Sequence, residues 1–212
     1  MTAAMNGADT IFALSSGAPP AGVAVVRISG PGVRFGLETM VGSVPEPRHA
    51  ALLSVRARDG TPIDRGLVLF FPGPDSFTGE DVAEFHLHGG RAVVQAVLAE
   101  LAMLPGFRLA VAGEFTRRAF QNRKVDLTQV EGLADLVAAE TEAQRRQALR
   151  QASGDLGRLY EGWRERLVRA RALLEAELDF ADEEDVPGSV SVQAWDIVRT
   201  LLQEIVNHVD DR

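Results

Sequence analysis

The feature that most constrains the fold is a long proline-free segment in the second part of the chain. No proline occurs between Pro105 and Pro187, and the segment is rich in Ala, Arg, Leu, Glu and Gln. Proline interrupts helices and these five residue types favour them, so we expect almost pure helix from residue 114 onward. Apolar side chains recur there at steps of three or four, which predicts one apolar stripe. The stripe consists of Leu149, Leu156, Leu159, Trp163, Leu167, Ala170, Leu174 and Leu178.

The helical pattern predicts three segments, at residues 127–140, 141 to about 180, and 192–209. An acidic run at residues 179–185, followed by Pro187, Gly188 and Ser189, is expected to end the second of them. Two or three helices with one apolar stripe each do not close a deep bundle. The sequence therefore predicts partner helices, supplied by another chain or by sequence outside this one.

The first 120 residues show short apolar runs separated by turn residues, a pattern typical of a mixed α+β unit. Residues 67–71 form a continuous apolar run, which predicts a strand buried on both faces. Residues 82–88 alternate, with Ala83, Phe85 and Leu87 on one face. The expected strands are residues 10–14, 22–29, 50–57, 67–71, 82–88 and 107–112, with helices at 33–41 and 91–103.

Composition excludes several classes of protein. The stretch from Thr10 to Val26 has no ionisable side chain, but it is broken by glycines and prolines, which argues against a spanning helix. No Lys or Arg precedes an apolar block near the N-terminus, so neither a secretion signal nor a transit peptide is expected, and we predict a cytoplasmic protein. The sequence has no cysteine, which excludes disulfides, thiolate metal sites and a cysteine nucleophile within this chain.

The net charge of −8 argues against a general nucleic-acid surface. Up to Phe120 the chain has 10 basic and 11 acidic residues, and after it 12 basic and 19 acidic. A partner is therefore the expected source of positive charge. Lys124 is the only lysine among 22 basic residues. It marks either a site that needs a compact ammonium group or an ordinary surface position.

Two groups of polar residues are candidates for a site. Glu84, His86 and His88 share one face of a strand, where they could bind a metal, form a hydrogen-bonding site beside the close backbone of Gly89 and Gly90, or be purely structural. Arg27 lies in the apolar strand 22–29, where its charge needs a partner, either a neighbouring carboxylate or a bound anion.

Two further segments are dense in special residues, and one nucleotide motif is missing. Residues 77–81 predict an ordered turn, and Arg117 and Arg118 lead toward Lys124 from a helix after Gly113, either as part of a site or as a solvated face. Neither a phosphate-binding Gly-x-x-x-x-Gly-Lys-[Ser/Thr] loop nor a Gly-x-Gly-x-x-Gly motif occurs in the sequence.

Six motifs in a fixed order closely resemble the N-terminal part of the MnmE (TrmE) family of tRNA modification GTPases. The resemblance extends from about Asp9 to Glu184 and so covers nearly the whole chain. The motifs are GVAVVRISG at residues 22–30, FPGPDSFTGED at 71–81, HGG at 88–90, GEFTRRAFQN at 113–122, KVDLTQVEG at 124–132 and LDFADEE at 178–184.

The resemblance implies a fold and a domain order. Residues 1–121 would form an α+β domain that binds tetrahydrofolate, is similar to folate-dependent aminomethyltransferases and forms a homodimer. Residues 122–212 would be the first half of an all-α central helical domain. The GTPase domain of the family would follow these helices, and it is absent from this chain.

The resemblance also implies three ligand residues for 5-formyl- or methylene-tetrahydrofolate: Arg27, Glu84 and Lys124. A carboxylate such as Glu84 can accept hydrogen bonds from the amino and ring N–H edge of a pterin. The cations Arg27 and Lys124 suit the carbonyl and glutamate-tail carboxylate groups of the ligand. No catalytic or metal-binding residue is expected in this chain.

The activity implied by the resemblance belongs to a larger assembly. With a flavin-dependent (FAD) partner subunit of the MnmG (GidA) type, the family forms 5-carboxymethylaminomethyl-uridine at the wobble position of tRNA, using a folate one-carbon unit and GTP hydrolysis that depends on magnesium and potassium. This chain alone lacks the phosphate loop and is not expected to hydrolyse GTP. The alternatives are a truncated, non-catalytic dimerisation module and a free-standing aminomethyltransferase-like protein.

Overall fold

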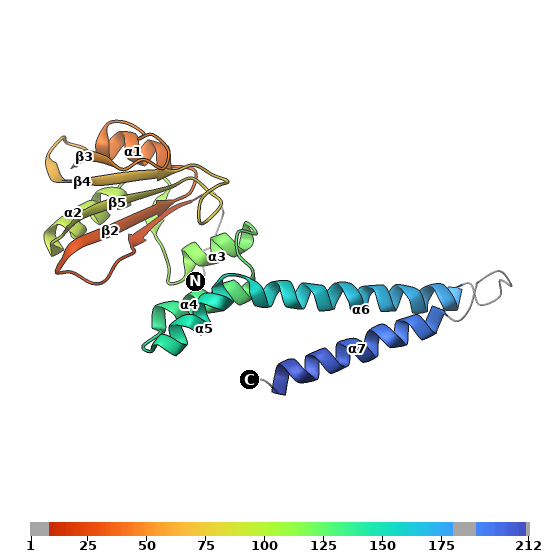
Figure 1. The fold of residues 1–212 in the computed structure, drawn as a ribbon. Helices are drawn as coiled ribbons and strands as arrows, with labels where there is room; N and C mark the ends of the chain where they lie inside the picture. Colours follow the sequence, from red (N-terminus) through yellow and green to blue (C-terminus); the bar gives the residue numbers. More distant parts are fainter. Residues whose placement is uncertain (1–8, 180–189, 211–212) are drawn as a thin grey trace, which may run out of the picture. The chain divides into compact units, whose positions relative to one another are not determined.

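The computed structural model describes residues 9–179 and 190–210 and contains two compact units (Figure 1). The units divide between Val125 and Asp126. The first unit combines a six-stranded sheet with helices, and the second consists of helices. The predicted fold class, an α+β domain followed by an all-α domain, is confirmed.

The sheet of the first unit has the strand order β3-β4-β5-β2-β1-β6. Neighbouring strands are antiparallel, except that β1 and β6 are parallel. Consequently the first strand lies inside the sheet and β6 forms its edge. The strands are β1 Thr10–Leu14, β2 Ala21–Ser29, β3 Ala51–Arg56, β4 Pro62–Phe71, β5 Val82–Gly89 and β6 Phe107–Leu109.

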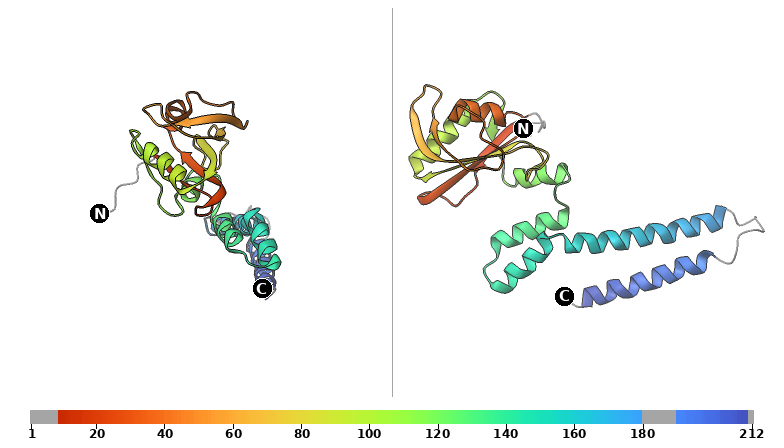
Figure 2. Two further views of the ribbon diagram at one scale, coloured as in Figure 1. Left: turned by 90° about the vertical axis from the view of Figure 1, so that its left-hand side faces the viewer. Right: turned by 45° about the horizontal axis from the view of Figure 1, so that its top comes forward.

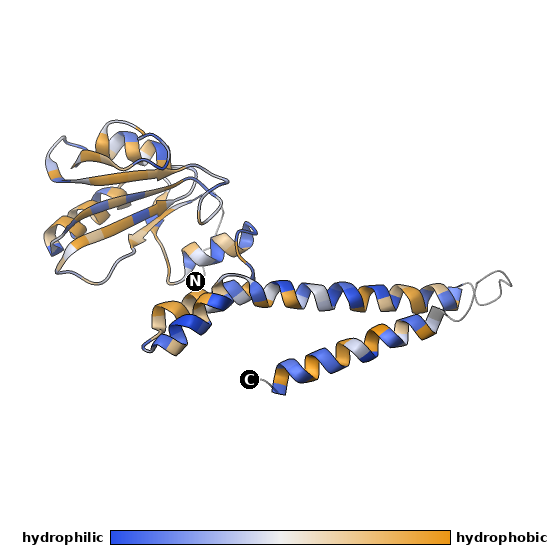
Figure 3. Ribbon diagram, in the orientation of Figure 1, coloured by the Kyte–Doolittle hydropathy of each residue, from blue (hydrophilic) through white to orange (hydrophobic). Residues whose placement is uncertain are grey.

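The helices α1 (Val33–Val41) and α2 (Arg91–Ala102) cover one face of the sheet. The strands turn alternate side chains toward them, because successive residues of a strand point to opposite faces. The apolar ribbon of the strands is visible in Figure 3. The buried cluster between the layers includes Phe12, Val26, Ile28, Leu37, Met40, Val68, Phe70, Phe85, Val97 and Leu101.

Two expectations for the strands are wrong. The run at residues 67–71 forms the second half of the longer strand β4. It is not buried on both faces, because Leu67 is 43% exposed. The cause is that the antiparallel sheet carries α1 and α2 on only one face. The last strand stops at Leu109 rather than at residue 112. The Glu114 carboxylate accepts the backbone N–H of Val111 at 2.9 Å, and this bond helps to turn the chain into α3 (Glu114–Gln121).

The second unit contains α4 (Leu127–Ala138), α5 (Glu142–Ala152), α6 (Asp155–Asp179) and α7 (Val190–Asp210). The single helix expected from residue 141 to about 180 is wrong, because Gly154 adopts a φ of +83° and separates α5 from α6. A left-handed glycine commonly ends a helix in this way. The acidic run expected to end the long helix lies, from residue 180, outside the described residues.

The helices α6 and α7 run side by side, as Figure 1 and the right view of Figure 2 show. Glu204 of α7 accepts a hydrogen bond from Trp163 Nε1 at 3.2 Å and pairs with Arg166 of α6. Many apolar side chains of this unit nevertheless stay exposed, among them Val137, Leu178 and Leu202. No helix within the described parts of the chain is long and apolar enough to cross a membrane.

Candidate functional site

The face of the sheet opposite α1 and α2 carries two of the three predicted ligand residues, Arg27 and Glu84, and we call it the open face. It is formed by the outward side chains of the three neighbouring strands β4, β5 and β2. Its register places Arg27 directly opposite Glu84, with Leu69 on the other side of Glu84. The residues of the open face are Val23, Val25, Arg27, Leu67, Leu69, Glu84, His86 and His88.

Arg27 and Glu84 form an ion pair across β2 and β5. Both contacts of the guanidinium fall on one carboxylate oxygen, because Nε donates to Oε1 at 2.9 Å and Nη2 lies 2.8 Å from the same atom. Both side chains are partly buried. Of the two partners expected for Arg27, the structure therefore shows the neighbouring carboxylate. Contact with a bound anion stays a prediction.

Two aromatic rings flank the guanidinium of Arg27. Its central carbon lies 5.8 Å from the ring centre of Phe77 and 5.7 Å from that of Phe115. Such distances are typical of cation–π contacts, which favour a cation over an aromatic face. Phe77 comes from the turn before β5 and Phe115 from α3, so the segment 72–81 and α3 both meet the open face at Arg27.

The two histidines of β5 have different partners. His86 Nε2 lies 3.0 Å from Glu84 Oε2, whereas His88 Nδ1 lies 2.8 Å from Asp64 Oδ1 on β4. His88 is therefore separate from the Glu84 pair, and the three side chains expected to share one site do not converge. Among the described residues no group of three His, Cys, Asp or Glu side chains is arranged to hold a metal ion.

Lys124 lies beside the turn that carries Phe77. Its backbone N–H donates to the carbonyl of Ala119 at 2.8 Å, which fixes the chain just after α3. Its side-chain carbons pass close to Gly79, where an added Cβ would come within 3.3 Å of Lys124 Cγ. Its ammonium group has no carboxylate partner within the described part of the chain. The structure thus brings Arg27 and Glu84 into contact and places Lys124 against the same turn, without a direct contact to either.

The turn at residues 76–81 is ordered, as the sequence predicts. The Ser29 hydroxyl of β2 shares a 2.7 Å hydrogen bond with Thr78 Oγ1 and donates to Glu80 Oε2 at 2.7 Å. Asn122 donates from its side chain to the carbonyl of Thr78 at 2.7 Å. Gly79 has a φ of +78°, a conformation that side chains with a Cβ rarely adopt. The turn is therefore tied to the sheet on one side and to the segment after α3 on the other.

A buried charge network holds α3 against the turn and the sheet edge. Glu114 is fully buried and receives Arg108 Nη2 at 2.6 Å and Arg118 Nη2 at 3.3 Å. Arg118 also donates to Glu80 at 3.1 Å and to the carbonyl of Asp9 at 2.9 Å. The hydrogen bond from Arg108 is the largest of the effects that lower the pKa of Glu114 to about 2. The carboxylate stays charged across the physiological range and fixes both arginines.

The network excludes one of the two interpretations of Arg118 and adds residues that the sequence did not single out. Arg118 is not part of a solvated helix face, since it is 6% exposed and paired. Arg108 lies only six positions before Glu114, but Glu80 is 38 positions from Arg118, so the contact with Glu80 follows only from the topology of the sheet. The available signal was a glutamate in the first turn of α3, followed by arginines three and four positions later.

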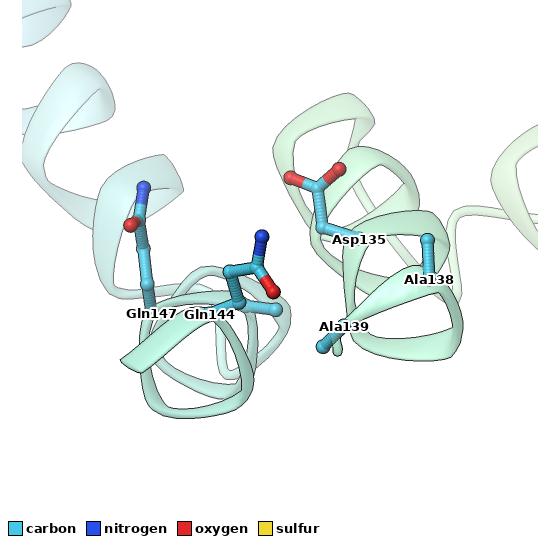
Figure 4. A pocket seen from close by; sticks show the side chains of 6 residues that line it. Asp135, Ala138, Ala139, Gln144 and Gln147 are labelled. Atoms are coloured by element: carbon cyan, nitrogen blue, oxygen red, sulfur yellow. The ribbon is translucent and has the colours of Figure 1, made fainter. Parts of the chain in front are cut away.

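The second unit has a small hollow between α4 and α5, shown in Figure 4. It is lined by polar and small side chains, and Gln144 already serves as a cap. Its Oε1 accepts the backbone N–H groups of Glu140 at 3.0 Å and of Thr141 at 2.9 Å. None of the predicted ligand residues lines this hollow. The lining residues are Asp135, Ala138, Ala139, Gln144, Gln147 and Ala148.

Comparisons with known proteins match both units. Residues 10–124 match the family model described as the GTP-binding protein TrmE N-terminus, and residues 127–212 match that of the MnmE helical domain. The chain is 69% identical over 95% of its length to a protein of Brucella anthropi, and 66% identical over the same share to proteins of Brucella canis and Brucella abortus. All three are named tRNA modification GTPase MnmE, and the chain spans 46% of the length of each.

Proposed function

Since the chain belongs to the MnmE (TrmE) family of tRNA modification GTPases, we propose that its first unit is the folate-binding and dimerisation part of such an enzyme. The observation that carries this proposal is the arrangement around Arg27. A carboxylate, a guanidinium and two aromatic rings meet there, and an ammonium group without a carboxylate partner in the described chain lies along the adjoining turn.

The residues present fit the chemistry of a reduced folate. Glu84 offers a carboxylate acceptor for the amino and ring N–H edge of a pterin, and Phe77 and Phe115 offer apolar ring faces beside it. Lys124 supplies a cation for the carboxylates of the glutamate tail. When bound, the folate would supply the one-carbon unit of the modification. The task of these side chains is to bind and orient it.

The remaining parts of the proposed reaction lie outside this sequence. Its residues form no phosphate loop, so GTP, magnesium and potassium are assigned to the GTPase domain of the longer relatives. FAD is assigned to a partner subunit of the MnmG (GidA) type. The net charge of −8 disfavours a tRNA-binding surface on this chain, and we assign tRNA binding to the assembled complex. The proposed location is the cytoplasm.

Calorimetric titration of the chain with 5-formyltetrahydrofolate, together with light scattering, tests the proposal. We expect saturable binding and the mass of a dimer. A dimer that does not bind would favour the alternative of a dimerisation module. Binding by a monomer would support the proposed folate site and contradict the proposed dimer. Truncation and a natural short form are separated by the coding sequence beyond Arg212, where a continuation with a Gly-x-x-x-x-Gly-Lys-Ser loop would establish truncation.

A further inference from the structure

The unusual feature of the Arg27–Glu84 pair is that the guanidinium uses only one oxygen of the carboxylate. Arginine and a carboxylate commonly pair as two parallel hydrogen bonds, one to each oxygen. Here Nε and Nη2 of Arg27 both approach Oε1. The second oxygen, Oε2, receives His86 Nε2 at 3.0 Å instead.

The contact with His86 fixes both the imidazole and the carboxylate. An ionised carboxylate only accepts hydrogen bonds, so His86 Nε2 must carry a proton and donate it. In its neutral form the ring is then the Nε2–H tautomer, and its Nδ1 has no hydrogen-bond partner within the described residues. The bond holds Oε2 away from the guanidinium and sets the orientation of the carboxylate plane.

The hydrogen bond to Glu84 is the main polar contact of the His86 ring. Val25 of β2 and Leu67 of β4 are its register neighbours on the open face, and both are apolar. Glu84 precedes it on the same face of β5, and through Glu84 it is coupled to Arg27. The hydrogen-bonding side chains of His88 and Asp64 are already paired with each other.

Counting lone pairs shows what this arrangement does for a ligand. A carboxylate offers about four acceptor positions. Two donors of Arg27 approach Oε1, whereas Oε2 has a single donor and keeps one position for an incoming N–H group. If His86 were absent, the guanidinium could turn the carboxylate and bind both of its oxygens. Oε2 would still have one donor, but its open acceptor position would point in a different direction.

We propose that His86 is a positioning residue of the ligand site, which fixes the orientation of the Glu84 carboxylate so that the open acceptor position of Oε2 is directed at an N–H group of the bound ligand. This inference rests on the proposed folate site and names the residue that prepares its acceptor. His86 does not itself touch the reacting atoms. Its role is to fix the oxygen that does the recognition.

The test compares three variants of the whole chain in calorimetric titrations with 5-formyltetrahydrofolate. His86→Leu removes the donor and should weaken binding about five- to tenfold, the effect of one ordinary hydrogen bond. His86→Gln retains an N–H donor and should stay within about threefold of the unchanged chain. The matched control is His88→Gln, on the same strand and face but paired with Asp64, which should bind like the unchanged chain.

A spectroscopic measurement on the ligand-free chain separates this inference from the folate proposal. In ¹⁵N-edited NMR spectra the His86 ring should show the Nε2–H tautomer, and the Nε–H signal of Arg27 should move in His86→Leu but not in His88→Gln. If the unchanged chain fails to bind folate, the proposed function fails while these signals still judge the role of His86. Equal folate affinity for all variants, or an Arg27 signal unmoved by His86→Leu, overturns the inference.

Discussion

At the scale of single residues, Glu84 connects the two sides of the proposed site. It neutralises Arg27, receives His86, and is the acceptor offered to a ligand. We expect Glu84→Ala to weaken binding of 5-formyltetrahydrofolate by about 1–3 kcal/mol, because a charge-assisted pair of hydrogen bonds is lost. Calorimetry measures the change. Glu46→Ala, which removes an exposed carboxylate beside His49, is the control, and unchanged affinity in Glu84→Ala would remove this residue from the site.

Gly79 is the second residue whose replacement tests the site. Its φ of +78° disfavours any side chain by about 1–2 kcal/mol, and an added Cβ would approach Asn122 Cβ to 3.0 Å and Lys124 Cγ to 3.3 Å. We expect Gly79→Ala to lower the free energy of unfolding and also to weaken folate binding by displacing Lys124.

Gly60→Ala is a close control for that prediction, since Gly60 has a φ of +88° but nothing within 4 Å of an added Cβ. Thermal unfolding should show a loss of stability in both variants, and only Gly79→Ala should lose affinity. Equal affinities in the two variants would contradict the assigned position of Lys124 in the site.

At the scale of elements, α3 depends on the carboxylate of Glu114. Removing one partner from a buried ion pair leaves the other charges uncompensated, so Glu114→Gln should lower the free energy of unfolding by about 3–5 kcal/mol. Denaturant unfolding measures this loss. Glu142→Gln is the comparison, because Glu142 also pairs with two arginines but on the surface of α5, and its replacement should have a much smaller effect. Similar losses in both variants would show that burial is not the cause.

The same carboxylate predicts how stability changes with pH. The pKa of Glu114 is about 2 in the folded chain, against an ordinary value of 4.5. The folded state therefore binds fewer protons than the unfolded state between these two values. The contribution of Glu114, about 3 kcal/mol, is fully present above pH 4.5 and is lost as the pH falls toward 2. Denaturant unfolding at several pH values gives the free energy of unfolding as a function of pH, and this free energy should vary less between pH 2 and 4.5 in Glu114→Gln than in the unchanged chain. An identical pH dependence in both would refute this account.

Most elements of the fold follow from local patterns, and the exceptions have physical reasons. The helix at residues 33–41 and the alternation of β5 are confirmed, because both are carried by side-chain periodicity alone. The break at Gly154 was missed, since a single glycine costs a helix only about 1 kcal/mol and its left-handed conformation cannot be seen in a pattern of apolar residues. The exposure of one side of β4 was also missed, because it depends on which face of the sheet the helices cover, and this is a property of the topology.

The site was only partly predictable for the same reason. Arg27 stood out as a charge in an apolar strand, and the structure supplies its partner through strand pairing over 57 positions. The buried network of α3 joins Asp9 with Arg108 and Arg118, residues about a hundred positions apart. The periodicity of apolar residues predicts only the local structure around a residue. Contacts between residues so far apart in sequence can be predicted only when the order of the strands in the sheet is known.

At the scale of the whole molecule, the two units differ in how completely they bury their apolar residues. The first unit has a closed core whose members all lie between residues 12 and 107. We therefore expect residues 1–125 alone to fold, with a cooperative thermal transition and a near-ultraviolet circular dichroism spectrum. A fragment that remains unfolded would mean that the helical unit is required for the stability of the sheet.

The helical unit should govern any association of the whole chain beyond the proposed dimer. Val137, Leu178 and Leu202 are 91%, 78% and 62% exposed, and apolar surfaces of this kind promote self-association. Light scattering should report assemblies larger than a dimer as concentration rises, and replacing Leu178 and Leu202 by Gln should reduce them. An unchanged mass distribution in that variant would locate the association elsewhere.

The parallel pairing of β1 with β6 has a consequence for how the molecule is made. β1 precedes the other strands of the sheet in the chain and leaves the ribosome before them, and its edge partner β6 begins only at Phe107, at the far end of the first unit. At roughly 5–20 residues per second, β1 waits for roughly 5–20 s before this contact can form. Lys124 emerges later still. The proposed ligand site can therefore be complete only when the whole first unit has been translated, and a ligand present during synthesis would stabilise the finished unit but would not guide its folding.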